Sequence, residues 1–110
     1  MGWLKRIFGL EKPANPTQVV QGQSNDSSIP AERVGLNGEY DDSGLAKRVV
    51  LAFDNESDLA DEERLWVAQT GSKVVLKGTV SDQATLTKMI SVARGVNGAT
   101  EVDVTEVTVG

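Results

Sequence analysis

A run of acidic residues in the second half of the chain is the first candidate for chemistry. Asp54, Glu56 and Asp58 fit positions 1, 3 and 5 of a calcium-binding loop. That loop also requires Gly at its sixth position and Glu at its twelfth, where this chain has Leu59 and Leu65. The sequence therefore favours a solvated acidic connection, without metal or cofactor, over a calcium site.

The composition removes most catalytic chemistries. The chain has no His and no Cys, which excludes Ser-His-Asp and Cys-His mechanisms and the usual zinc sites. Paired carboxylates can also catalyse acid–base reactions, as they do in glycosidases. Here the acids crowd one connection and lack an aromatic pocket that would separate their pKa values. We therefore expect no catalytic residues and no enzyme activity.

The N-terminal segment 1–12 combines apolar residues at helical spacing with cations. The residues that we expect to contact a membrane are Trp3, Leu4, Lys5, Arg6, Ile7 and Phe8. A short cationic helix of this kind lies flat in a membrane interface, where Trp is favoured. Each nearby Lys or Arg adds about 1 kcal/mol of attraction to an anionic leaflet. Binding to a partner protein and packing on the chain's own domain are the alternatives.

The charge and hydropathy of the whole chain restrict its partners and its location. The formal net charge is −5, which argues against nucleic acid as a partner. No apolar run reaches the roughly 18 residues of a membrane-spanning helix, and no secretory signal is convincing. We expect a cytoplasmic protein that is peripheral on the inner face of a membrane.

Proline and glycine divide the chain into three parts. Pro13, Pro16 and Pro30 interrupt helix formation, and the polar stretch among them has little to bury. We therefore predict a flexible linker over residues 13–42 and one folded domain over residues 43–110.

Two helices are predicted in this domain. Apolar residues at helical spacing indicate a first helix that begins at Ser43 and ends near Asp54, with Arg48 on its solvent side. The second helix is expected to have Ser81 as its N-cap and Gly95 as its C-terminal stop.

Three strands complete the predicted α+β fold. Strands over 65–69 and 73–80 form a hairpin, and a third covers 100–109. The second helix supplies a crossover to this last strand, so we predict a mixed sheet with both helices on one face. Val102 and Val107 of the last strand are an odd number of positions apart, so in a regular strand their side chains would point to opposite faces. A bulge near Thr105–Glu106 would reconcile them, unless both faces of the strand are partly covered.

Trp66 lies on the opposite face of its strand from Leu65 and Val67. On a covered face it would belong to the core, and on an open face it would be a binding residue. We expect Trp66 in the core.

Two motifs occur in the order of a known family. Residues 74–80 (VVLKGTV) match a V-x-L-x-G-x-V strand. Residues 96–102 (VNGATEV) are similar to a V-x-G-V-x-x-V close, with Ala99 where a larger apolar residue is usual. On these motifs, residues 43–109 resemble the BON domain, a small module named for bacterial osmotic-stress and nodulation proteins.

The resemblance implies binding rather than catalysis. BON modules are associated with phospholipid surfaces and with envelope or stress physiology, and some members bind small ligands or potassium. The recurrent glycines of the family correspond to Gly78 and Gly98. We interpret them, together with the turn residue Gly71, as structural glycines rather than ligand contacts.

The sequence thus predicts a non-enzymatic adaptor that its N-terminal segment anchors to an anionic phospholipid surface. The alternative is a soluble module that senses a small ligand or potassium, or binds a partner protein, through the BON-like domain.

Overall fold

The computed structural model describes residues 3–10, 28–59, 62 and 64–110. The helices and strands follow the predicted order in the domain, with a helix added near the N-terminus. In chain order they are α1 (Trp3–Phe8), the 3₁₀ helix η1 (Ala31–Arg33), α3 (Gly44–Asp54), the 3₁₀ helix η2 (Ser57–Leu59), β1 (Leu65–Thr70), β2 (Lys73–Val80), α4 (Gln83–Arg94) and β3 (Glu101–Val109).

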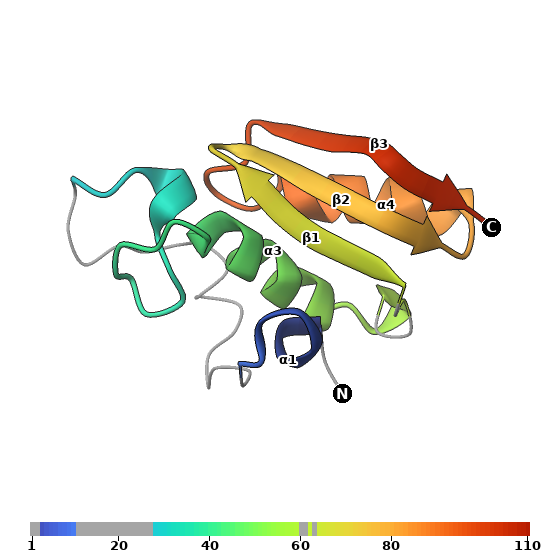
Figure 1. Ribbon diagram of the computed structural model, residues 1–110, viewed down its shortest axis with the longest axis horizontal. Helices are drawn as coiled ribbons and strands as arrows, with labels where there is room; N and C mark the ends of the chain where they lie inside the picture. The colour runs from blue at the N-terminus through green and yellow to red at the C-terminus, as the bar shows by residue number, and fades with distance from the viewer. Residues whose placement is uncertain (1–2, 11–27, 60–61, 63) are drawn as a thin grey trace.

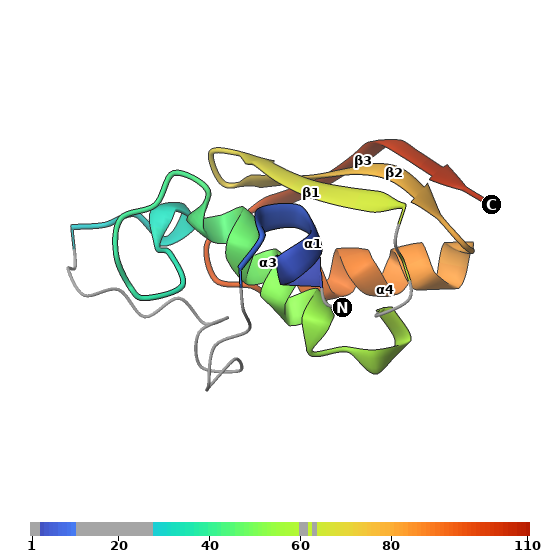
Figure 2. The same ribbon diagram turned by 60° about the horizontal axis from the view of Figure 1, so that its bottom comes forward.

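The sheet is mixed, as predicted. Its strand order is β1-β2-β3, with β1 antiparallel and β3 parallel to β2. The parallel pair is joined through α4, because a parallel connection must cross from one end of the sheet to the other. Helices α3 and α4 lie on the same face of the sheet, and the opposite face is left open by both (Figures 1 and 2).

Strand β3 contains the predicted irregularity. Val75 pairs with Asp103, but Lys77 pairs with Glu106, so β3 has one extra residue between these two pairs. The Asp103 carboxylate accepts a hydrogen bond from the Thr105 N–H at 2.9 Å. The bulge brings Val107 to the face that packs against the core.

The core lies between the sheet and the two helices. Alternate residues of β1 and β2 point inward, and α3 is buried over most of its length. The fully covered side chains of this layer include Leu45, Val49, Phe53, Leu65, Val74, Leu76, Val80 and Met89. This arrangement agrees with the apolar periodicity of the sequence.

The helix ends agree with the predictions except for the N-cap of α4. Helix α4 ends at Arg94, immediately before the predicted stop. Its N-cap is Asp82 rather than Ser81, since the Asp82 carboxylate accepts a hydrogen bond from the Thr85 N–H at 2.8 Å. Ser81 instead donates its N–H and hydroxyl to the Glu62 carboxylate. Ser43 occupies the N-cap position of α3 but makes no side-chain capping bond.

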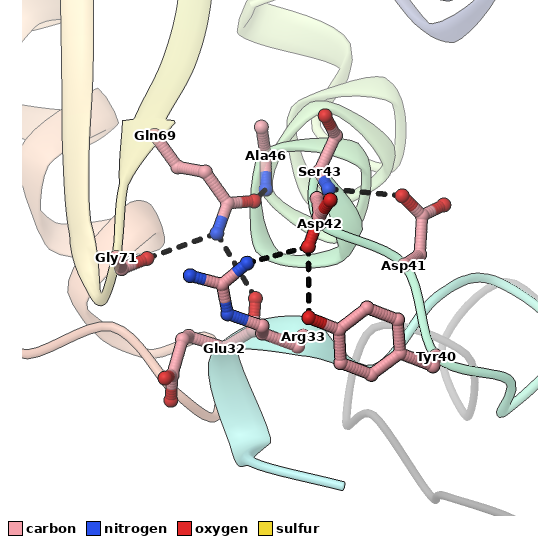
Figure 3. Close-up of polar contacts among 9 residues, drawn as sticks. All are labelled: Glu32, Arg33, Tyr40, Asp41, Asp42, Ser43, Ala46, Gln69 and Gly71. Atoms are coloured by element: carbon pink, nitrogen blue, oxygen red, sulfur yellow. Dashed lines mark hydrogen bonds and ion pairs between the residues drawn. The ribbon is translucent and has the colours of Figure 1, made fainter.

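Part of the predicted linker has a defined structure. Residues 28–42 fold against the start of α3, and Val34 is buried. Gln69 of β1 joins three segments there. Its carbonyl oxygen accepts from the Ala46 N–H at 2.8 Å, and its amide group donates to the carbonyl oxygen of Glu32 at 3.0 Å (Figure 3). Residues 13–27 of the same prediction lie outside the described residues.

The prediction that Arg48 faces solvent is wrong. Its side chain is fully buried, and its guanidinium donates to the carbonyl oxygens of Ala31, Val34 and Asn97. Burial lowers the pKa of Arg48 from its ordinary value. The helical periodicity of α3 could not reveal this, because the covering segments come from outside the helix.

Candidate functional site

The predicted membrane-contact residues lie in α1, which packs against α3 beside the start of β1 (Figure 2). Trp3 and Leu4 are each only 1% exposed. Ile7 and Phe8 are partly buried against the same core, whereas Lys5 is exposed. In this structure the apolar face of the segment therefore faces the protein's own domain, which is the self-packing alternative of the sequence analysis.

Trp3 is the main contact of α1 with the domain. Its indole N–H donates to the carbonyl oxygen of Leu59 at 2.8 Å. Its ring meets that of Phe53 edge to face, with 5.1 Å between centroids and 66° between planes. A buried Trp needs both an apolar surround and a partner for its N–H, and Phe53 and Leu59 supply them.

Asp54 holds the first turn of α1. One carboxylate oxygen accepts from the Trp3 N–H at 2.5 Å and the other accepts from the Leu4 N–H at 3.0 Å. These N–H groups have no carbonyl partner within a helix, and a negative charge there also matches the helix dipole. The residue considered as a metal ligand thus caps a helix that is distant in sequence.

The other two acids of the calcium-loop pattern bind a lysine instead. Lys88 of α4 lies 2.5 Å from Asp58 and 3.0 Å from Glu56. The hydrogen bond with Asp58, and after it that with Glu56, raises the pKa of Lys88, and the bond from Lys88 lowers the pKa of Asp58. Among the residues that the structure describes, no three potential ligands gather at a metal position.

Arg6 connects α1 to β1 and lies near two tryptophan rings. Its guanidinium carbon is 4.6 Å from the ring centre of Trp3 and 5.2 Å from that of Trp66. The same group donates to the carbonyl oxygens of Leu65 at 2.9 Å and Glu62 at 3.0 Å. A planar guanidinium suits such a site because it can stack and donate several hydrogen bonds together.

The Leu65 carbonyl lies on the open edge of the sheet. The neighbouring carbonyl of Arg64 accepts from the Thr79 N–H of β2 at 2.9 Å. Successive residues of a strand direct their backbone groups to opposite sides, so the Leu65 carbonyl points away from β2. Arg6 therefore occupies a hydrogen-bonding position that the edge strand leaves open.

Trp66 corrects the prediction that it belongs to the core. It is 50% exposed on the sheet face that α3 and α4 leave open. Leu65 and Val67 take the covered face of β1 and are buried. The sequence contained the signal, because the pair of large aliphatic residues marks the inward face better than one aromatic residue does.

Backbone geometry accounts for the glycines of the two family-like motifs. Gly78 has φ of +122°, and a Cβ there would overlap the carbonyl oxygen of Arg64. Gly98 has φ of +102°, and a Cβ there would lie 2.8 Å from the carbonyl group of Ala31. Gly71 has φ of +60° in the turn between β1 and β2. These positions favour glycine without any ligand.

Comparisons of the chain with protein-family models, with curated proteins and with solved structures found no match. Among the described residues, no helix is long and apolar enough to cross a bilayer.

Proposed function

We propose that the protein is a non-enzymatic adaptor whose helix α1 exchanges between its docked position and an anionic phospholipid surface. The supporting observation is that α1 is amphipathic as a unit. Trp3 and Leu4 face the domain while Lys5 faces solvent. The resemblance of residues 43–109 to the BON domain, with its association with phospholipid surfaces, points in the same direction.

The free energies of the two positions are similar in size. Burying Trp3 and Leu4 against the domain stabilises the docked state by about 3–6 kcal/mol in transfer terms. A membrane interface offers the same side chains a comparable apolar surround. It also adds about 1 kcal/mol for Lys5 when the lipid is anionic, whereas Arg6 exchanges its docked hydrogen bonds for the same attraction. The docked state then prevails in water, and anionic lipid shifts the population toward release.

Asp54 is the residue that separates the two states. Its carboxylate accepts hydrogen bonds from α1 only in the docked position, and it would be left behind when α1 enters a membrane. Removing it should weaken docking by about 1 kcal/mol, as for other helix caps. The membrane-bound state should not be affected.

The test is co-sedimentation of Asp54→Ala and wild type with vesicles that contain phosphatidylglycerol. We expect about fivefold tighter binding of the variant, since 1 kcal/mol corresponds to that factor. Asp42→Ala is the matched control, because it removes the same charge from a carboxylate that binds Arg33 and Tyr40 rather than α1. Deletion of residues 1–12, which removes the proposed anchor whole, should abolish binding to the vesicles.

Two results would refute the exchange. Equal binding of Asp54→Ala and Asp42→Ala would mean that the change in net charge, and not release of α1, controls attachment. Undiminished binding after deletion of residues 1–12 would mean that α1 is not the anchor.

A further inference from the structure

Trp66 is a large apolar side chain that lies exposed on the open face of the described sheet. On this face Trp66 of β1 is paired across the strands with Lys77 of β2, and Ala68 is paired with Val75. Because residues two apart in a strand share a face, Arg64 lies on the same side as Trp66. We call these five residues, together with Arg6, the Trp66 patch.

The Trp66 patch is cationic although the chain is acidic. Arg64 is exposed, and the Arg6 guanidinium stacks on the indole at 5.2 Å. The Lys77 ammonium is 3.9 Å from Glu106, and the two side chains are 52% and 63% exposed. So long and exposed an ion pair contributes little, and a competing carboxylate can replace it. Three cations thus surround one exposed indole in a protein of net charge −5.

Among the described residues, the acids of the open face lie on β3, at the edge of the sheet away from β1. Glu101, Asp103 and Glu106 all belong to β3, and their partners in the register are the β2 residues of the open face. A flat anionic bilayer resting on this face would meet the cationic and the acidic halves together. An extended peptide is about 5 Å wide, close to the spacing of one strand, and can lie along β1, so that it approaches a β3 carboxylate only at Lys77, beside Glu106.

We propose that the Trp66 patch binds an acidic peptide segment of a partner protein. An apolar side chain of the peptide packs on the Trp66 indole beside Ala68 and Val75. Flanking carboxylates of the peptide pair with Arg64 and Lys77. An exposed aromatic residue with cations around it has the chemistry of a binding hot spot, because it combines a large contact area with directed charge.

The patch is complete only while α1 is docked. Arg6 supports the indole from the edge of the sheet and belongs to α1. Peptide binding therefore stabilises the docked helix and opposes its release to a membrane. This coupling rests on the proposed function, whereas binding at the patch does not.

The test uses the full chain and a short synthetic peptide in which Glu alternates with Leu. Binding is followed by proton–nitrogen NMR, where the indole signals of Trp3 and Trp66 report separately. We expect the Trp66 signal to shift and the Trp3 signal to stay. Trp66→Ala should weaken binding about tenfold or more, as for an interface hot spot. A peptide with Gln in place of Glu should bind more weakly.

Lys77→Gln and Lys88→Gln form the matched pair of charge variants. Both lysines are on the surface and both have acidic partners, but Lys88 lies on α4, away from the open face. Lys77→Gln should weaken binding about two- to fivefold, the range of an exposed ion pair, and Lys88→Gln should leave it unchanged. Equal effects of the two changes would overturn the proposal, because binding would then depend on the net charge of the protein rather than on the Trp66 patch.

A second outcome would also overturn it. If anionic vesicles shift the Trp66 indole signal while the Trp3 signal stays and the peptide has no effect, the open face is a lipid-binding surface. If vesicle binding depends on residues 1–12 and leaves the Trp66 signal unchanged, the peptide titration alone tests the Trp66 patch, so failure of one proposal does not imply failure of the other.

Discussion

The tryptophan of the terminal segment is buried and the tryptophan of the folded domain is exposed, which is the reverse of what their positions in the chain suggest. Trp3, in a terminal segment, is 1% exposed and donates its indole N–H to a backbone carbonyl. Trp66, in a strand of the domain, is 50% exposed. Arg6 lies against both rings. An apolar face in the sequence therefore predicts that its residues are buried, but contacts with the rest of the fold decide which surface buries them.

Trp3→Ala should produce the largest change in this comparison. Replacing a buried Trp by Ala costs about 3–5 kcal/mol in protein cores. We expect a loss of that order in the free energy of unfolding, measured by urea denaturation. A loss below about 1 kcal/mol would contradict the role of Trp3 as part of the core.

Arg6→Lys should have an intermediate effect. The change keeps the charge but removes the planar group that donates to Leu65 and Glu62 and stacks on both indoles. We expect about 1–2 kcal/mol of lost stability, in line with hydrogen bonds made by charged groups. The tryptophan fluorescence, to which Trp3 and Trp66 both contribute, should change at the same time. If stability and fluorescence both remain those of wild type, Arg6 does not connect the two tryptophans.

Trp66→Ala should change stability by less than about 0.5 kcal/mol, as is usual for surface substitutions. Its ring contributes little to the core, so urea denaturation should give a curve close to that of wild type. The contrast with Trp3→Ala is the control. Destabilisation similar to that of Trp3→Ala would place Trp66 in the core after all.

Acidification should produce the smallest of these effects. As the pH falls, it should change the surroundings of Trp3 before those of Trp66. The hydrogen bond from Lys88 lowers the pKa of Asp58 in the folded protein. The stability from this pair is therefore present above the unfolded pKa of about 3.9 and is lost as the pH falls through the folded pKa. Because Asp58 belongs to η2, whose Leu59 carbonyl binds Trp3, the Trp3 indole NMR signal should shift first below about pH 4. The same titration of Lys88→Gln, in which the pair is absent, is the control.

Much of the domain could be predicted from local patterns. The apolar spacing from Leu45 to Phe53 indicates α3, and alternation from Lys73 to Val80 indicates β2, because each burial pattern arises within one element. The change of parity between Val104 and Val107 indicates the bulge for the same reason. Helix α4 between β2 and β3 implies their parallel pairing, since a crossover returns the chain to the end of the sheet where β2 begins.

The contacts that the sequence analysis missed concern residues whose environment depends on distant segments. Arg48 is buried because residues 28–42 and the loop after α4 cover that side of α3. Trp3 is buried because Phe53 and Leu59 form its surround. Asp54 caps α1 across a separation of about fifty residues. Neither periodicity nor spacing records such contacts, so the docked helix could not be found from the sequence alone.

The bulge in β3 has a consequence for self-association. An outer strand rich in Val and Thr is a template on which a second chain can add a strand and begin aggregation. In β3 the extra residue breaks the regular spacing of the ladder, and the Thr105 amide is already bound by Asp103 of the same strand. An incoming strand would meet an irregular edge lined with carboxylates, which protects this side of the sheet against aggregation.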